Sequence, residues 1–197
     1  MPTDASARPI VLSVHASGGH AFSKPAGAVV RLIENWGVEG DAHAGLTDQH
    51  VYHVKRFGPT PNLRQVHLIA AETLDDLATQ GHTVRAGELG ENISTRNLDL
   101  LALPTGTRLS LGPDAVIELT GLRNPCVQID KFQRGLTKLL VDRGPDGPVL
   151  KCGVMSIVIR SGEVRPDDVI TIALPSLPHT PLAYVPPVAA THGSVGA

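Results

Sequence analysis

The sequence predicts a mainly β fold with a few helices, an α+β chain whose strands form a closed, barrel-like sheet. Short apolar stretches with strand character recur at intervals of about ten residues, a spacing typical of closed β architectures. Glycine (20 residues) and proline (16 residues) are frequent, so many short elements joined by tight connections are expected. Two segments carry the apolar spacing of an amphipathic helix.

The first half of the chain contains three predicted strands and one helix. The helix covers residues 72–80, where Leu74 and Leu77 are three apart and share a face. Residues 37–45 (GVEGDAHAG) form a turn or a functional loop, and the polar stretch 46–62 is a surface loop with one helical turn. The predicted strands, rich in Val, Ile and Leu, are 9–14, 28–33 and 66–70.

The second half alternates strands with turns and contains the other helix. Phe132, Leu136, Leu139 and Leu140 have the spacing of one helical face. Residues 142–148 form a turn. The predicted strands are 98–103, 108–111 and 116–120, followed by a terminal hairpin of 153–160 and 164–174.

Length and composition favour one globular domain with loose ends. The expected division is a flexible leader over residues 1–8, a domain over 9–174 and a disordered Pro- and Ala-rich tail over 175–197. A net charge of -2, from 17 basic and 19 acidic residues, argues against a nucleic-acid-binding protein. No signal peptide or membrane-spanning stretch is recognised, so a cytoplasmic protein with reduced thiols is expected.

Cys126 is the candidate catalytic residue, in the sequence R-N-P-C after a predicted strand. Pro125 restricts its own backbone and keeps Asn124 extended, which presents the sulfur rigidly. Arg123 favours the thiolate, the form that acts as nucleophile and metal ligand. A buried core cysteine is the alternative that the sequence leaves open. Cys152, which precedes an apolar strand, is interpreted as a core residue.

The glycine-flanked loop 37–45 places Asp41 and His43 two residues apart. Such a pair holds a metal, acts as acid and base, grips a polar ligand or satisfies the amides of its own loop. The spacing of His43, His50 and His53 also allows a zinc site, although no carboxylate or cysteine completes a recognised pattern.

A second glycine-rich loop, GELGEN (87–92), offers Glu88, Glu91 and Asn92 to a ligand. Its glycines permit close backbone approach, but it lacks the lysine and hydroxyl of a phosphate-binding loop. Carboxylate bonds to the loop's own amides are the alternative role for one of the glutamates. Arg64 precedes a predicted strand, and its guanidinium suits phosphate or carboxylate unless it is simply solvated.

Taken together, these segments resemble the MOSC family, named for the C-terminal domain of molybdenum cofactor sulfurase. No single motif is diagnostic, but the ordered set of GDxHxG, RQVHL, GENI and a cysteine after an arginine is specific. The resemblance runs from about residue 10 to 174 and points to a stand-alone bacterial member, related to proteins that protect against hydroxylamino-purines. The matching segments are GVEGDAHAG (37–45), NLRQVHLI (62–69), GELGENIS (87–94), LPTGTRLSLG (103–112) and GLRNPCVQIDKF (121–132).

The resemblance implies a fold similar to the β-barrel domain of pyruvate kinase and binding of the molybdenum cofactor. It implies that Cys126 is the sulfur ligand of molybdenum or a sulfur carrier. The longer sulfurases add a pyridoxal-phosphate aminotransferase-like domain, for which this chain has no room, so pyridoxal phosphate is not expected. The cofactor-binding residues that follow are Asp41, His43, Arg64, Glu88, Glu91, Asn92, Arg123 and Asn124.

Several functions remain open from the sequence. The first is a molybdenum-dependent oxidoreductase that reduces N-hydroxylated small molecules. No ferredoxin cysteines are present, so it would need a separate electron-transfer protein. The second is a sulfur carrier that receives a persulfide on Cys126 from a donor protein. A binding domain without turnover and a zinc hydrolase using His43, His50 and His53 complete the set. No nucleic acid or membrane partner is expected.

Overall fold

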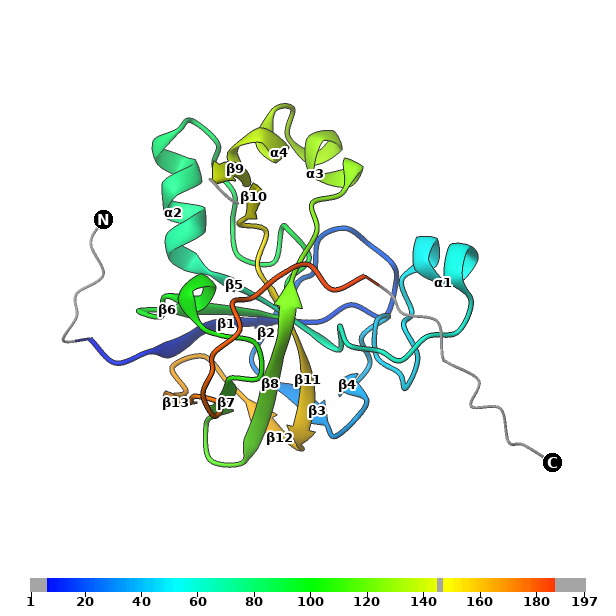
Figure 1. Ribbon diagram of the computed structural model, residues 1–197, viewed down its shortest axis with the longest axis vertical. Coiled ribbons are helices and arrows are strands. Elements are labelled where there is room, and N and C mark those ends of the chain that lie inside the picture. The colour runs from blue at the N-terminus through cyan, green and yellow to red at the C-terminus, as the bar shows by residue number, and fades with distance from the viewer. Residues whose placement is uncertain (1–6, 145–146, 187–197) are drawn as a thin grey trace.

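The computed structural model describes residues 7–144 and 147–186, which form an α+β fold of short strands and helices (Figure 1). In chain order the elements are β1 (Ile10–His15), β2 (Ala26–Gly27), β3 (Val30–Ile33), β4 (Gly37–Val38), α1 (Val51–Phe57), β5 (Val66–Ala70), α2 (Ala71–Thr79), β6 (Ile93–Arg96), the 3-10 helix η1 (Leu100–Ala102), β7 (Arg108–Leu111), β8 (Ala115–Leu122), α3 (Val127–Phe132), α4 (Leu136–Leu139), β9 (Val141–Gly144), β10 (Gly147–Leu150), β11 (Val154–Arg160), β12 (Gly162–Val164) and β13 (Ile170–Ala173).

Eight strands form the main sheet, in the order β13-β7-β8-β11-β5-β6-β1-β2. All neighbours are antiparallel except β5 and β6, which α2 connects as a parallel pair. The ladder between β8 and β11 runs from Leu122 opposite Val154 to Val116 opposite Arg160. The residues that follow β8 and those that precede β11 therefore meet at one end of this ladder, the Leu122 end. The other is the Arg160 end.

The main sheet does not close, so the predicted barrel-like architecture is wrong. Its order ends at β13 on one side and at the two-residue strand β2 on the other. The start of β1 contacts the segment before β13 through one isolated bridge, between Ile10 and Val169, and the backbone hydrogen bonds around it, but no ladder joins β1 to β13. A single bridge is not a ladder, and regular strand spacing says nothing about whether the outer strands pair with each other. The fold is α+β with a large, mostly open sheet.

Helix α2 confirms the helix predicted over 72–80, and β5 confirms the buried strand predicted before it. Leu74 and Leu77 are buried on the face that α2 turns toward the protein. Burial of such a side chain contributes about 1.5–3 kcal/mol. These leucines join Ile129 of α3 and Leu136 of α4 in a second hydrophobic core. The three helices gather at the Leu122 end of the ladder, where β8 ends (Figure 1).

Other predicted elements are wrong in type or extent. Residues 98–103 hold η1 instead of a strand, because the Asp99 carboxylate accepts the Ala102 N–H at 3.3 Å and caps a turn. The second predicted helix is split into α3 and α4, since Gly135 adopts a left-handed φ of 89° between them. Strands β9 and β10 extend into the predicted turn over 142–148.

The predicted terminal hairpin is also wrong. Both of its segments contain strands, but these do not pair with each other: β11 pairs with β8 and β5, β12 pairs with β3, and β13 pairs with β7. The apolar pattern therefore identified strands, while their partners come from distant parts of the chain.

The ends of the chain differ from the predicted division. The first six residues of the expected leader over 1–8 lie outside the described residues, as do 187–197 of the expected tail. Residues 180–186, the C-terminal segment, instead contact the main sheet. Leu182 in this segment is 8% exposed and belongs to the main hydrophobic core. The globular unit thus extends beyond the predicted boundary at residue 174.

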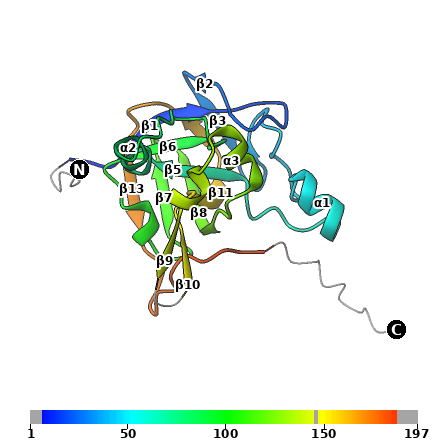
Figure 2. The same ribbon diagram turned by 90° about the horizontal axis from the view of Figure 1, so that it is seen from above.

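Helix α1 lies at the periphery of the protein in both views, and none of its residues is buried (Figures 1 and 2). Within the described part of the chain, no helix is long and apolar enough to cross a membrane.

Candidate functional site

Cys126 lies at the Leu122 end, where the chain passes from β8 into α3. It is the N-cap residue of α3 and has an extended backbone. Its side chain is half-buried against the second hydrophobic core, whereas Cys152 is fully buried. Burial raises the pKa of Cys152 to about 11. Cys126 is therefore the accessible thiol, and the core interpretation of Cys152 agrees with its position.

Arg123 connects the cysteine loop to the GELGEN loop. Its backbone N–H donates to the Gly153 carbonyl at 2.9 Å, which continues the β8–β11 ladder toward Cys126. Its Nη1 donates to the Leu89 carbonyl at 2.8 Å. No carboxylate in the described ranges forms an ion pair with Arg123. Asn124, predicted to bind the cofactor, is exposed.

Asp41 is the centre of a buried polar cluster that holds loops together. Its carboxylate lies 2.7 Å from the Lys24 ammonium, and both side chains are almost fully buried, at 4% and 2% exposure. It also accepts hydrogen bonds from Asn92 Nδ2 at 3.1 Å and from the Ser17 N–H at 3.2 Å. The loop of residues 37–45 is thereby fixed to the GELGEN loop and to the segment after β1.

The electrostatics of this cluster follow from burial and pairing. Burial acts to raise the pKa of Asp41, but hydrogen bonds from His43 and the nearby Lys24 ammonium outweigh it and hold the pKa well below its usual range. Burial lowers the pKa of Lys24, and the Asp41 charge opposes this effect. Lys24 and Asp41 form a close ion pair, and both Asp41 oxygens are engaged within the protein.

The three polar residues of the GELGEN loop also form hydrogen bonds within the protein, while the buried Oε2 of Glu91 has no hydrogen-bond partner among the described residues. Glu91 is fully buried and its Oε1 accepts from the Gly87 N–H at 2.6 Å, while Glu88 accepts from the Arg85 N–H at 2.7 Å. Asn92 accepts from a backbone N–H of β5 at 3.2 Å and donates to Asp41. The structure places these side chains in the framework of the loop, where carboxylate-to-amide bonds hold it in shape.

Four imidazole rings form a row beside the Asp41 cluster. His43 packs between His20 and His50, with ring centroids 5.3 and 6.4 Å away, and His50 stacks on His53 at 4.3 Å. Asp48 accepts from His53 Nδ1 at 2.7 Å. Burial, aided by the nearby His53, lowers the pKa of His50 to about 4. The described residues contain no group of three or more His, Cys, Asp or Glu arranged to hold a metal, so the zinc interpretation has no support.

Arg64 lies next to this row and contacts the C-terminal segment. Its Nη2 donates to the Val185 carbonyl, and its guanidinium carbon lies 5.2 Å from the centre of the Tyr184 ring. Burial lowers the pKa of Arg64. Arg123 and His50 are both close enough to interact with it electrostatically. Arg64 has no ion-pair partner among the residues that the structure describes.

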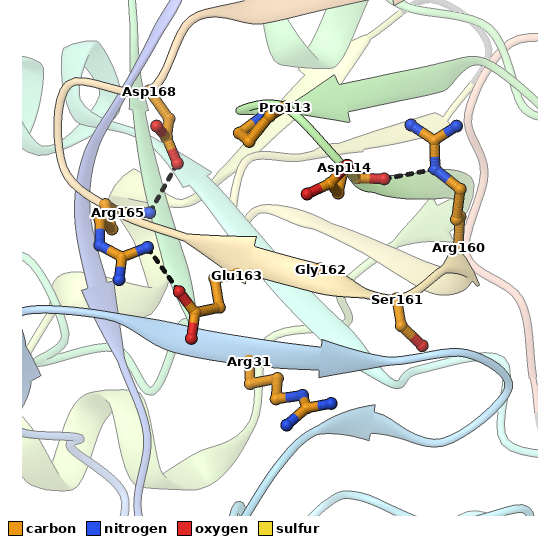
Figure 3. A pocket seen from close by; sticks show the side chains of 9 residues that line it. All are labelled: Arg31, Pro113, Asp114, Arg160, Ser161, Gly162, Glu163, Arg165 and Asp168. Atoms are coloured by element: carbon orange, nitrogen blue, oxygen red, sulfur yellow. Dashed lines mark hydrogen bonds and ion pairs between the residues drawn. The ribbon is translucent and has the colours of Figure 1, made fainter.

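A separate cavity of about 620 Å³ lies at the Arg160 end of the ladder. Its lining contains both arginines and acidic residues, and Figure 3 shows Arg165 hydrogen-bonded to Glu163 and Arg160 hydrogen-bonded to the Asp114 carbonyl. It contains no cysteine or histidine. The lining residues are Arg31, Pro113, Asp114, Arg160, Ser161, Gly162, Glu163, Arg165 and Asp168. The chemistry-bearing residues therefore lie at the opposite end of the ladder.

Two contributors to the Leu122 end were missed in the sequence. Lys24 in F-S-K-P carried no signal, because lysine is normally exposed and its partner Asp41 is 17 positions away. Tyr184 lay in a stretch whose Pro, Ala, Ser and Gly content predicted disorder. The tertiary fold determines which carboxylate pairs with Lys24 and which ring stacks on Arg64, so local sequence does not reveal either partner.

A family model for the MOSC domain matches residues 42–171. The chain belongs to the MOSC domain family. This family is associated with binding of the molybdenum cofactor. The match includes Arg64, the GELGEN loop and Cys126, and it ends within β13. No curated protein matches this MOSC chain.

Solved structures share the fold of this MOSC protein. The YuaD protein from Bacillus subtilis is 21% identical with a TM-score of 0.70, over 86% of this chain and 98% of that one. YiiM from Geobacillus stearothermophilus is 14% identical with a TM-score of 0.63, over 89% and 80%. YiiM from Escherichia coli is 19% identical with a TM-score of 0.56, over 86% and 72%. At these identities the likeness establishes the fold.

Proposed function

We propose that this MOSC protein binds the molybdenum cofactor through Cys126 and acts in the reduction of N-hydroxylated compounds. The observation that carries the proposal is a half-buried thiol at the end of the sheet where Arg64 and Arg123 interact electrostatically and neither forms an ion pair with a carboxylate among the described residues. Thiolate is a soft ligand suited to a transition metal, and guanidinium groups suit a phosphate. These side chains therefore fit a cofactor that contains both a transition metal and a phosphate.

Each group has a distinct role in this proposal. The cofactor supplies two-electron redox chemistry when bound. Cys126 ligates the metal, Arg64 and Arg123 hold the anionic group, and the buried Lys24–Asp41 pair keeps the surrounding loops rigid. His43 Nδ1 lies 3.3 Å from Asp41, so Nε2 is the nitrogen left to exchange a proton with substrate.

The overall reaction fixes what the protein needs from a partner. An N-hydroxylated compound R–NH–OH takes up two electrons and two protons and gives R–NH2 and water. The N–O bond breaks, and its oxygen leaves as water. A separate electron-transfer protein supplies the electrons. Because this function requires a free thiol at Cys126, we propose that the protein acts in a reducing compartment, the cytoplasm.

Metal content tests the proposal directly. Wild type, Cys126→Ser and Cys152→Ala are expressed in cells that make the cofactor, and molybdenum per protein is measured by mass spectrometry after gel filtration. We expect near-stoichiometric metal in wild type and Cys152→Ala and loss of metal in Cys126→Ser. Retention of metal by Cys126→Ser would show that this thiol is not the ligand. Absence of metal from all three proteins would refute cofactor binding.

A sulfur carrier is the second candidate function, and the different environments of the two cysteines favour it. Cys126 is accessible, while Cys152 is buried with a raised pKa, so one thiol is available for transfer. The Cys126 thiolate attacks the outer sulfur of a donor persulfide, which forms Cys126–S–SH and releases the donor thiolate.

Intact-mass spectrometry after incubation with a cysteine desulfurase and cysteine tests the sulfur-carrier function. A reductant-sensitive gain of about 32 Da, one sulfur atom, is expected in wild type and absent in Cys126→Ser. An equal gain in both proteins would exclude Cys126 as the carrier. Neither metal nor persulfide on Cys126 would leave a non-catalytic binding domain.

A further inference from the structure

The C-terminal segment, residues 180–186, is fixed beside the loop that carries Cys126. The Thr180 carbonyl accepts the Thr105 N–H at 2.8 Å, and the Ala183 carbonyl accepts the Leu122 N–H at 2.9 Å. Tyr184 forms a parallel bridge with Leu122, the last residue of β8. Together with the buried Leu182 side chain, these contacts hold the segment along the end of β8.

Gly121 makes this approach possible. A Cβ atom at this position would lie 2.5 Å from the Ala183 carbonyl oxygen and 2.7 Å from the Val185 side chain. Contacts this short do not occur, so any larger residue would push the segment away. The glycine of the G-L-R-N-P-C sequence thus admits the C-terminal segment next to the candidate site.

The segment meets Arg64 in a way that leaves its charge available. The guanidinium is stacked over the Tyr184 ring and donates Nη2 to the neutral Val185 carbonyl. A guanidinium has five N–H donors, so one carbonyl leaves further donors for a ligand. Neither contact carries a full negative charge, and the nearby Asp48 carboxylate stabilises the guanidinium electrostatically without forming an ion pair with it, so the partly buried cation is only partly compensated. An anionic ligand is the partner that would compensate it.

We propose that the C-terminal segment is a working part of the site, in which Tyr184 and the Val185 carbonyl position Arg64 to receive the anionic group of the ligand, a phosphate. The segment adds a third chain region to the cysteine and GELGEN loops. It acts through Arg64, so Tyr184 is a positioning residue. A guanidinium already held in place loses less conformational freedom on binding, which raises affinity. The identity of the phosphate as part of the cofactor rests on the proposed function.

Inorganic phosphate is the probe that tests the positioning role on the full chain. Its affinity is measured by calorimetry at low ionic strength, together with the 15N signal of the Arg64 Nε–H group, assigned by its loss in Arg64→Lys. We expect phosphate to shift this signal in wild type and Arg64→Ala to abolish the binding. Tyr184→Ala should weaken binding about five-fold, a typical effect of losing a cation–π contact.

Two matched variants separate positioning from general damage. Tyr184→Phe retains the ring, and Val185→Ala retains the backbone carbonyl, so both should bind phosphate as wild type does. Tyr184 is 37% exposed, so its replacement should leave the protein folded. Unchanged affinity in Tyr184→Ala would overturn the proposal. Tighter binding would also overturn it, because the segment would then compete with phosphate for Arg64.

The failure of this inference is distinguishable from failure of the proposed function. Phosphate binding is measured on metal-free protein, whereas cofactor binding is judged by molybdenum content. A phosphate-induced shift of the Arg64 15N signal, weakened in Tyr184→Ala, in a protein that never acquires molybdenum would support the positioning role and reject cofactor binding. Loss of molybdenum in Cys126→Ser, together with a phosphate affinity that does not depend on Tyr184, would support cofactor binding and reject the positioning role.

Discussion

Charged side chains are exposed at one end of the β8–β11 ladder and buried at the other. At the Arg160 end, arginines and carboxylates both line a cavity, and the Arg165 and Glu163 side chains of one ion pair are each 53% exposed. At the Leu122 end, Lys24 and Asp41 form an almost fully buried pair, and Arg64 is partly buried against a ring and a carbonyl. The cavity at the Arg160 end therefore carries balanced, solvated charge, while the Leu122 end carries buried polarity that packing alone does not explain.

This difference shows which feature identifies a site. A cavity can arise wherever strands end, and solvated ion pairs contribute little to stability. Burying charge is costly, so buried charged groups mark positions with a structural or chemical task. Three predictions test whether the two ends differ as described, from the largest expected effect to the smallest.

Asp41→Asn should be the most damaging change. It leaves the buried Lys24 ammonium without its counter-charge, which costs about 3–5 kcal/mol of unfolding free energy for a buried pair. Glu163→Gln removes a carboxylate from the exposed pair at the Arg160 end and should cost at most about 1 kcal/mol. Urea unfolding at neutral pH measures both. Equal losses would mean that the two ends do not differ in how they hold charge.

Leu182→Ala should have the next largest effect. Its side chain is buried in the main core, so truncation should cost about 2–3 kcal/mol. Leu177 lies in the same stretch but is 80% exposed, and Leu177→Ala should change stability by less than about 0.5 kcal/mol. Thermal unfolding of the two variants measures the contrast. If Leu182→Ala is as stable as Leu177→Ala, the Leu182 side chain does not anchor the C-terminal segment in the main core.

His50 should make stability depend on pH by a smaller amount. Its pKa is lowered to about 4 from an ordinary value near 6.5, so the unfolded chain binds its proton first. Stability from this group is therefore complete above about pH 6.5 and is lost as pH falls toward 4. With a discount for partial exposure, we expect a loss of about 1 kcal/mol between pH 7 and pH 5.

Matched variants isolate that contribution. His50→Gln should flatten the dependence of the urea midpoint on pH by this amount, while His179→Gln, which alters an exposed histidine, should leave it unchanged. The depressed pKa values of His15 and His67, which arise mainly from burial, persist in both variants and cancel in the comparison. Identical pH profiles for wild type and His50→Gln would contradict the prediction.

The sequence predicted local features better than long-range ones. The strand at 66–70 and the helix after it depend on the apolar pattern of contiguous residues, and both are confirmed. The 3-10 helix at 100–102 depends on one side-chain cap from Asp99, which competes with strand propensity and leaves no periodic signal. Strand pairing and sheet closure depend on distant partners, which explains the wrong terminal hairpin and the wrong barrel.

The site shows the same division. Residue types and glycine spacing pointed to Cys126, the Asp41 loop and the GELGEN loop, and the structure brings Asp41 and Asn92 into contact. Which acceptors stay free for a ligand depends on partners that local sequence does not specify. Oε1 of Glu91 is bonded within its own loop while Oε2 has no partner among the described residues, and Tyr184 contacts Arg64 from 120 positions away in the sequence.

The course of the C-terminal segment also determines where an appended polypeptide would be delivered. The last described residue, Pro186, follows directly on the Val185 carbonyl that holds Arg64, whereas the chain enters β1 beside the bridge between Ile10 and Val169. A polypeptide joined directly after Pro186 would therefore begin beside Arg64. One joined directly before Ile10 would instead begin beside Val169.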